Sequence, residues 1–401
     1  MASERVTTDL VDWEVIHIST GHEGGAGLAA RRLNAALNAK HINSKFVALE
    51  KSGYSPGNHE FCLKRNFWQK LVSGIISRIQ SIISKKVFFS IFSVNILTIG
   101  KLLDIAETSR PIIHIHNWFN IISQKQIIKF LNAGFPVVLT MHDQRIFTGG
   151  CHYSFECQGF QKNCNYCPII AAGLKHWPSR VIKKAKRLPN TLDSNFQLIA
   201  PSKWMLEQAQ KSTLVGSSRI HFVPNTLDVL PESRDKSGRN RAPSDVLEIG
   251  IASMNKDSYI KGGDIIADLE SKIANQKLPM NLTFLSDDDV QMNPVELFWN
   301  KIDYLLVPSR ADNSPNVIHE AKHYEVAVIA TLVGGIPELL HTGFDIGIPE
   351  SDLSADFILR VIAAEMRTNF AVNLPLMISD FNKYVGESVK MHLKVYSDIL
   401  A

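Results

Sequence analysis

Short apolar runs rich in β-branched residues alternate along this chain with longer stretches in which apolar residues recur at helical spacing. The runs of the first half are Glu14–Ile18, Lys45–Leu49, Ile112–His116, Val137–Met141, Gln197–Ala200 and Ile220–Val223. Those of the second half are Leu247–Ala252, Asn281–Leu285, Asp303–Val307, Val326–Ala330 and Phe344–Ile348. Strand-sized runs that alternate with helical stretches predict parallel sheets covered by helices.

One segment interrupts this alternation and predicts a linker. Pro224–Asp245 reads PNTLDVLPESRDKSGRNRAPSD, which is rich in proline, serine and charge and has no apolar period. The chain therefore divides into two α/β halves, and ligands of such folds bind at the carboxyl ends of the strands.

Composition and charge narrow the class of protein. The chain has 401 residues, 45% of them apolar, which is enough to bury a core in each half. Its formal net charge of only +4 argues against a dedicated nucleic-acid binder. The chain starts with the polar, acidic MASERVTTDLVDW and has no uninterrupted apolar stretch of about 18 residues. We therefore expect a soluble, cytoplasmic protein.

Four of the five cysteines are clustered, at Cys151, Cys157, Cys164 and Cys167. Thiolates are good zinc ligands, but only the last pair has the C-x2-C spacing of zinc knuckles. In a reducing compartment the cluster is either a structural zinc site or a set of reduced thiols that pack a loop.

A glycine-rich turn follows the first predicted strand. Gly24, Gly25 and Gly27 precede a helix that we expect to begin near Ala26. Such a turn lets the backbone approach an anion at the helix N-terminus, although a tight turn alone also explains it.

Histidines end two further strands of the first half. His116 follows IIHI, and His142, which is followed by Asp143, ends PVVLTM. Because the carboxyl ends of parallel strands form binding sites, these residues are candidates for hydrogen bonds to a ligand. Strand-end residues satisfied within the protein are the alternative.

Two lysines follow the first strand of the second half. Lys256 and Lys261 precede Gly262 and Gly263, which open a helix. A lysine beside a helix N-terminus is suited to clamp a diphosphate. The alternative is a solvated surface lysine.

The most informative segment is VPSRADNSPNVIHEAKHYEVAVIATLVGGIPELL. Asp312 and Asn313 lie in a loop after a strand, Pro315 begins a helix, and Glu320 lies within that helix. Two carboxylates eight residues apart can point into one cleft and bind vicinal hydroxyls, while the helix start offers N–H groups to phosphate.

These motifs together resemble the GT-B glycosyltransferases of family 4, in particular those of bacterial capsule, O-antigen and exopolysaccharide assembly. The resemblance rests on GGAG, HIHN, TMHDQRIFTGGCHYSFEC, APSKW, VPNTLD, the KGG lysine and PSRADNSPNVIHEA with GGIPEL. It implies an α/β GT-B fold, in which two Rossmann-like domains face each other across a cleft. An acceptor-binding domain would span 1–224 and a donor-binding domain 225–375, and a helix in 376–401 would pack back on the first domain.

The resemblance also assigns roles to residues. Glu320 matches the acid that binds the donor ribose, and Asp312 stands where the family more often has a glutamate that contacts the transferred sugar. The expected catalytic residues are His116, Lys261, Asp312 and Glu320. The expected donor-binding residues are Gly24, Gly25, Lys256, Lys261, Asn313, Asn316, Val317 and Glu320, and His142 and Asp143 are expected on the acceptor side.

The implied activity is transfer of a sugar from a nucleoside-diphosphate sugar to a glycan or lipid-linked acceptor, with retained anomeric configuration and without a catalytic metal. Asn255 replaces the family's usual arginine, and Asp312 is shorter than glutamate. A catalytically weak sugar-nucleotide-binding protein of the same fold is therefore the alternative. The basic stretch Lys175–Arg187 is expected to be a solvated helix face rather than a nucleic-acid site.

A basic stretch without acids suggests a membrane surface as a partner. Phe61–Leu103 contains seven Lys or Arg and no Asp or Glu. Within it, Asn66–Lys86 has Phe67, Leu71, Ile75, Ile79 and Ile83 at four-residue spacing. This pattern predicts a helix that either lies on an anionic bilayer from the inner face of the membrane or packs against the core.

Overall fold

In the computed structural model the chain divides into two compact units. The first unit comprises residues 1–228 and 386–401, and the second comprises residues 229–385. The structure describes residues 13–83, 89–90, 93–170, 172–186, 195–216, 219–227, 246–252, 257–285, 294–367 and 378–400. Most of the predicted linker, and Lys256 with it, lies outside the described residues.

The first unit is built on a 7-stranded parallel sheet of order β3-β2-β1-β4-β5-β6-β7. Its strands are β1 (Val15–Ile18), β2 (Ser44–Leu49), β3 (Glu60–Leu63), β4 (Ile112–Ile115), β5 (Val137–Thr140), β6 (Phe196–Ala200) and β7 (Ile220–Phe222). The strand order reverses between β1 and β4, and a crevice for ligands forms at the carboxyl ends of strands at such a point.

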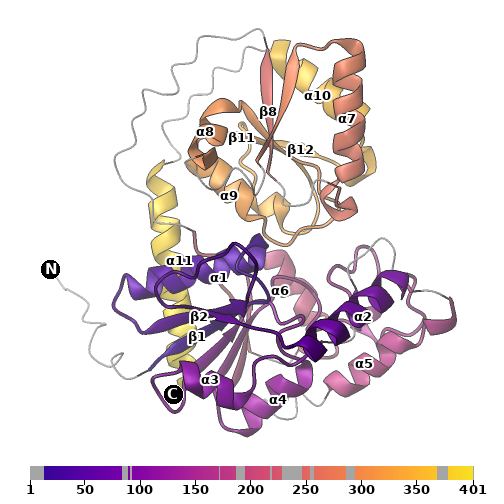
Figure 1. The fold of residues 1–401 in the computed structure, drawn as a ribbon. Helices are drawn as coiled ribbons and strands as arrows, with labels where there is room; N and C mark the ends of the chain where they lie inside the picture. Colours follow the sequence, from indigo (N-terminus) through magenta and orange to yellow (C-terminus); the bar gives the residue numbers. More distant parts are fainter. Residues whose placement is uncertain are drawn as a thin grey trace. The chain divides into compact units, whose positions relative to one another are not determined.

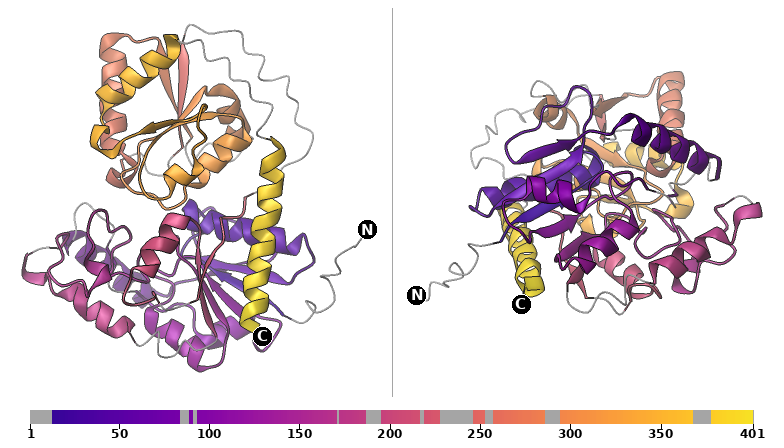
Figure 2. Two further views of the ribbon diagram at one scale, coloured as in Figure 1. Left: turned by 180° about the vertical axis from the view of Figure 1, so that it is seen from behind. Right: turned by 60° about the horizontal axis from the view of Figure 1, so that its bottom comes forward.

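Helices cover both faces of this sheet (Figure 1). They are α1 (Gly24–Asn38), α3 (Ile99–Ile105), α4 (Gln124–Asn132), α5 (Trp177–Ala185), α6 (Lys203–Gln210) and the end of α11 (Ile378–Leu400). Helix α2 (Phe67–Ile83) belongs to the same unit. Buried side chains of α1 and α11 share one core, and those of α3, α4, α5 and α6 share the other. The left view of Figure 2 shows α11, in yellow, lying along the sheet.

Side-chain caps explain where several of these helices begin. The hydroxyls of Thr98, Ser123 and Ser202 each accept a hydrogen bond from a backbone N–H in the first turn of α3, α4 and α6. A cap of this kind stabilises a helix start by about 1 kcal/mol.

The second unit holds a 5-stranded parallel sheet of order β12-β11-β10-β8-β9. The strands are β8 (Leu247–Ala252), β9 (Met280–Leu285), β10 (Tyr304–Val307), β11 (Ala327–Thr331) and β12 (Ile346–Ile348). The helices are α7 (Gly263–Gln276), α8 (Pro294–Lys301), α9 (Asn316–His323) and α10 (Ala355–Arg367). One core includes side chains of α7 and α10 and the other includes side chains of α8 and α9, so the sheet lies between two helical layers. Its strand order reverses between β8 and β10.

Every predicted strand is present, within two residues at either end. The sequence analysis missed β3, a short strand at the edge of the first sheet whose four residues are all partly exposed. An edge strand of this kind has no continuous apolar run, so the pattern on which the other strands were recognised is absent.

Helix α2 differs from the other helices of the first unit because its apolar face is exposed. Phe67, Trp68 and Ile82 are 71%, 69% and 73% exposed, and Leu71, Val72, Ile75 and Ile79 are also exposed. The buried residues on this helix are polar, namely Ser73 and Gln80. None of its described side chains belongs to the hydrophobic cores. Among the described helices, none has the length and apolar character needed to cross a membrane.

Candidate functional site

The second unit brings two predicted site residues together where its strand order reverses. Lys261 ends the short 3-10 turn Tyr259–Lys261 after β8, and Asp312 lies in the loop after β10. The Lys261 Nζ donates to Asp312 Oδ2 at 2.5 Å. The lysine is partly exposed and the carboxylate is buried, so a cation is held at the carboxyl ends of β8 and β10, where ligands of such folds bind.

Arg310 holds the loops after β8 and β10 together. Its guanidinium donates to both carboxylate oxygens of Asp264 at 2.6 and 2.8 Å and to the Tyr259 carbonyl at 2.8 Å. It also lies 4.0 Å from the centre of the Tyr259 ring. Bidentate pairing with stacking fixes a guanidinium in a way that lysine cannot reproduce. Arg310 therefore positions the turn that presents Lys261.

Two glycines allow the backbone of this site to pack closely. Gly262 has φ 77° and Gly334 has φ 58°, both in the left-handed region that favours glycine. A Cβ on Gly262 would lie 2.2 Å from the Pro308 carbonyl oxygen, and one on Gly334 would lie 1.8 Å from that of Asp312. The Asp312 carbonyl accepts from the Gly335 N–H at 3.1 Å, so the GGIPE loop fixes the position of Asp312.

The start of α9 supplies the remaining donor-binding candidates of this unit. Pro315 is the N-cap residue and makes no side-chain cap, so the first-turn N–H groups of Asn316 and Val317 are not capped by it. Asn313 and Asn316 are buried, and Glu320 lies one turn after Asn316 on the same helix face. A helix N-terminus with a lysine nearby combines N–H donors, dipole and charge, which suits phosphate.

A buried ion pair behind α9 anchors the helix. Lys322 Nζ pairs with Asp345, whose Oδ1 accepts from Val328 N–H at 2.9 Å and whose Oδ2 accepts from His341 N–H at 2.7 Å. Burial lowers the pKa of Lys322, although Asp345 opposes this shift. The pair ties α9 to β11 and to the loop before β12, and it was not recognised from the sequence.

In the first unit, the predicted His116 belongs to a chain of three histidines at the β1–β4 reversal. His17 Nδ1 and His116 Nε2 share a hydrogen bond of 3.0 Å, and His116 Nδ1 and His142 Nε2 share one of 3.1 Å. His17 and His116 are buried, whereas His142, which follows the carboxyl end of β5, is partly exposed. Both ring nitrogens of His116 are therefore bonded to other imidazoles, and His142 is the member of the chain that reaches the surface.

Two more histidines, His114 on β4 and His392 on α11, extend this cluster. His114 lies beside His17 in the strand register and bonds Tyr396 Oη at 2.6 Å and Thr140 Oγ1 at 2.8 Å. Desolvation lowers the pKa of His17 to about 3 and the pKa values of His142 and His392 to about 4. It also holds the pKa values of His114 and His116 well below the usual range. The cluster is therefore neutral near pH 7.

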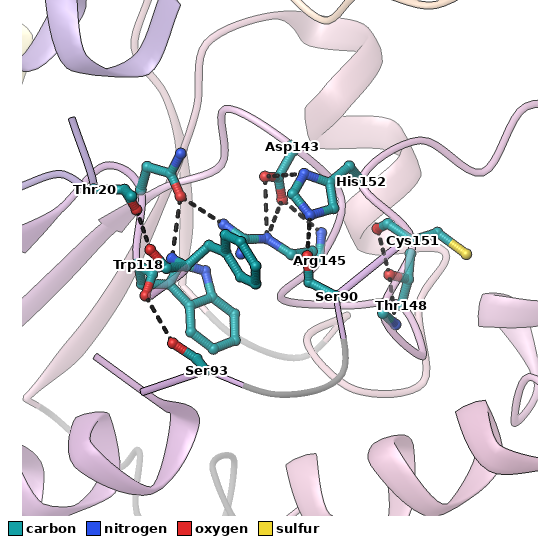
Figure 3. A network of polar contacts seen from close by, with 12 residues as sticks. Thr20, Ser90, Ser93, Trp118, Asp143, Arg145, Thr148, Cys151 and His152 are labelled. Carbon is teal, nitrogen blue, oxygen red and sulfur yellow. Dashed lines mark hydrogen bonds and ion pairs between the residues drawn. The ribbon is translucent and has the colours of Figure 1, made fainter. Parts of the chain in front are cut away.

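A polar network around Arg145 surrounds the predicted acceptor-side residue Asp143 (Figure 3). Arg145 Nε lies 3.2 Å from Asp143 Oδ2, and His152 Nδ1 lies 3.2 Å from the same oxygen. Arg145 Nη2 also donates to Asn117 Oδ1 at 2.9 Å. Burial tends to raise the pKa of Asp143, but Arg145 and His152 together hold it well below its usual range. Asp143 is thus an anion whose charge is matched locally.

The glycine turn after β1 lies at the same reversal. Helix α1 begins at Gly24, and its N-cap residue Glu23 makes no side-chain cap. A Cβ at Gly25 would meet no described atom within 4 Å, so there is space beside this backbone for a ligand. Glu23 pairs with His22 at 3.0 Å and also with Lys51, which places a carboxylate next to the turn.

The clustered cysteines lie in the loop region after β5. Cys151, Cys164 and Cys167 are buried. A hydrogen bond from Cys151 lowers the pKa of Cys167 to about 6, and burial raises that of Cys164 to about 11. Among the described residues, the one group of three or more potential ligands with ligand atoms within 4.8 Å of one another is His17, His114 and His116. A zinc ion on the cysteines stays a prediction.

The structure therefore gathers the sequence candidates at two strand-order reversals, one in each unit. Lys261, Asp312, Asn313, Asn316, Val317 and Glu320 belong to the second unit, and Gly24, Gly25, His116, His142 and Asp143 belong to the first. The sequence analysis missed Arg310 and Arg145, each of which positions a predicted residue. Both arginines could have been recognised as candidates, because each follows the end of a predicted strand by a few residues, in PSRAD and HDQR.

The chain is similar in sequence to known glycosyltransferases. Residues 256–364 match the sequence model of the family described as Glycosyl transferases group 1. The chain is 23% identical over 354 residues to the putative colanic acid biosynthesis glycosyl transferase WcaC of Escherichia coli (strain K12), covering 79% of this chain and 82% of that protein.

Two solved structures show the same fold over nearly the whole chain. Sucrose-phosphate synthase of Thermosynechococcus elongatus superposes with a TM-score of 0.57 at 13% identity, covering 97% of this chain and 96% of that one. HepE of Anabaena in complex with UDP-glucose superposes with a TM-score of 0.54 at 13% identity, covering 96% of this chain and 99% of that one.

Proposed function

We propose that this chain is a nucleotide-sugar-dependent glycosyltransferase of group 1, a proposal that its sequence and fold similarities support. We propose further that it belongs to family 4 and transfers a hexosyl residue with retained configuration. The donor is a nucleoside-diphosphate sugar, and the acceptor is a saccharide on a glycan or lipid. The observation that carries the proposal is the contact between Lys261 and Asp312 across the strand reversal of the second unit.

Each group of the second unit then has a task. Lys261 and the N–H groups of Asn316 and Val317 bind the diphosphate, whose negative charge grows as the glycosidic bond breaks. Glu320 binds the ribose hydroxyls, and Asp312 contacts the sugar. When the diphosphate binds the Lys261 ammonium in place of Asp312, the Asp312 carboxylate becomes able to accept hydrogen bonds from sugar hydroxyls. This supports turnover with aspartate in place of the family's usual glutamate.

The reaction is a front-face substitution. The bond between the sugar's anomeric carbon and the diphosphate oxygen breaks, and a bond to the acceptor oxygen forms on the same face. The acceptor hydroxyl loses its proton to the departing diphosphate, so no protein base is needed. His142, backed by His116 and His17, and Asp143 lie on the acceptor side in the first unit.

We also propose that the enzyme binds the inner face of a membrane through α2. An anionic bilayer is the partner that fits, because the exposed apolar face lies within a stretch that has seven basic residues and no acid. Insertion of the apolar face into the bilayer would act together with electrostatic attraction between the basic residues and the anionic lipid, which contributes about 1 kcal/mol per basic residue near the surface. A lipid-linked acceptor would then be presented from the same surface.

A thermal-shift screen of sugar nucleotides, followed by an assay for nucleoside diphosphate release, tests the proposed activity. A donor present at about 100 times its dissociation constant stabilises the protein by about 2.7 kcal/mol. Stabilisation with slow release of the diphosphate supports the enzyme. Stabilisation without release, even when acceptors are added, supports the sugar-nucleotide-binding alternative.

A further inference from the structure

The first unit contains a cavity that neither the donor residues nor the histidine chain accounts for. Its volume is about 550 Å³, within the range of small-molecule sites. It is lined by Ser90, Ser93, Asn95, Trp118, Phe119, Ser123, Gln124, Lys125, Arg145, Thr148, Gly150, Trp177, Arg180, Val181 and Lys184. The loop after β4, the loop after β5 and one face of α5 therefore contribute to the same cavity.

The charges of this lining have one sign. Lys125, Arg145, Arg180 and Lys184 are cations, and none of the described lining residues is an acid. Asp143 pairs with Arg145, but the structure gives Lys125, Arg180 and Lys184 no ion-pair partner among the described residues. Arg180 and Lys184 are four residues apart on α5, a spacing at which like charges repel. An anion bound between them would offset this repulsion.

Aromatic rings form the rest of the wall. Trp118, Phe119 and Trp177 line the cavity, and Trp118 lies under the Arg145 guanidinium at 4.8 Å. Figure 3 shows Trp118 and Arg145 beside Ser90, Ser93 and Thr148. The flat C–H face of a pyranose packs on indole rings, while hydroxyl and amide side chains can bond its equatorial hydroxyls. The lining thus combines stacking surfaces for a sugar with cations for an acid group.

We propose that this cavity binds an anionic saccharide, a sugar ring that carries a carboxylate or a phosphate, as part of the acceptor. The identification of this saccharide as the acceptor rests on the proposed glycosyl transfer. Its binding to the cavity does not depend on turnover. The rings of Trp118 and Trp177 stack on the sugar, and Arg180, Lys184 and Lys125 hold the acid group. The basic face of α5 is then a binding surface rather than only a solvated one.

Isothermal titration calorimetry, which measures the affinity of the purified full-length protein for each of three probes, tests this proposal. The probes are a disaccharide ending in glucuronic acid, its neutral counterpart ending in glucose, and glucose 1-phosphate. The variant is the double substitution Arg180→Ala with Lys184→Ala. The matched control, Lys183→Ala with Lys186→Ala, removes the same charge from the last turn of α5 and its C-cap residue without touching the cavity lining. Melting temperatures establish that both variants fold.

We expect the acidic probes to bind more tightly than the neutral one. We also expect the Arg180 and Lys184 variant to lose about tenfold or more in affinity for them, while the control binds as the wild type does. The stronger of the two acidic probes identifies carboxylate or phosphate as the recognised group. A Trp177→Ala variant should weaken the acidic and the neutral disaccharide alike.

Three outcomes would overturn the proposal: equal binding of acidic and neutral disaccharides, equal losses in the two double variants, or tighter binding of a single-stranded oligonucleotide than of any saccharide. Diphosphate release from sugar nucleotides is measured separately on the wild type. If the wild type releases no diphosphate but binds the acidic saccharides, the proposed activity alone is refuted. If it releases diphosphate but does not bind the acidic saccharides, the role of the cavity alone is refuted.

Discussion

Lys261 and Asp312 meet across the point where the strand order of the second sheet reverses, with 2.5 Å between Nζ and Oδ2. The loops that carry them follow β8 and β10, which are adjacent in the sheet but far apart in the sequence. The position of the Lys261 cation is therefore determined by the sheet topology and by Arg310, which joins the two loops.

Arg310→Lys tests the arginine's positioning role. The substitution keeps the charge but removes the bidentate bond to Asp264 and the stacking on Tyr259. We expect the KM for the donor to rise by about tenfold with a smaller change in kcat, because Lys261 is then less well placed. Steady-state kinetics check this.

Arg360→Lys is the control for this change, since Arg360 also lies over an aromatic ring of the second unit, that of Phe357, but outside the site. A rise in KM that is the same in both variants would contradict the positioning role of Arg310.

The histidines of the cluster predict acid sensitivity of the first unit. Their folded pKa values lie near 3 to 4 for His17, His142 and His392, below the ordinary value of 6.5. Above about pH 7.5 the imidazoles are almost entirely neutral in both states, so they do not affect stability. Below it the unfolded chain binds protons that the folded chain does not, and each histidine destabilises the fold by about 2 kcal/mol at about pH 5.

Denaturant unfolding at a series of pH values measures this slope. His392→Gln removes one buried imidazole and should flatten the slope by the contribution of one group. The groups around it in the cluster are His114 and Tyr396. A free energy of unfolding that does not change between about pH 7.5 and about pH 5 would refute the neutral cluster.

Flotation with vesicles tests the exposed face of α2. We expect the protein to bind vesicles that contain anionic lipid and to lose that binding when Trp68 and Ile75 are both changed to serine. Both side chains are exposed, so the fold should be unaffected. The control is Leu297→Ser, which removes an exposed apolar side chain of the second unit. Binding to neither type of vesicle, or unchanged binding by the α2 variant, would rule out this membrane surface.

Apart from β3, the sequence predicted the strands of both sheets because each central strand is a short, mostly apolar run bounded by polar residues or proline. It also predicted Lys261, Asp312 and Glu320 as site residues. The pairing of Lys261 with Asp312 was not predictable, because it requires β8 and β10 to be neighbours. Strand order depends on long-range packing that local pattern does not encode.

The histidine cluster likewise could not be predicted from the local sequence pattern. His116 was visible as a strand-end residue, but His17 lies within an apolar run and carries no such signal. Only the parallel register that places His17 beside His114 reveals the cluster. For α2 the period was predicted correctly, and the structure decided which face is exposed, with Ser73 and Gln80 turned inward.

The most direct test of the account is nucleoside diphosphate release from the preferred sugar nucleotide by wild type, Lys261→Ala and Lys272→Ala. Lys272 is the matched control, since it is also a lysine of the second unit in an ion pair with an aspartate, Asp356, but it lies outside the site. We predict that Lys261→Ala loses about 100-fold or more in rate while keeping its melting temperature, and that Lys272→Ala retains the wild-type rate. A folded Lys261→Ala protein that releases diphosphate as fast as the wild type would contradict the central claim.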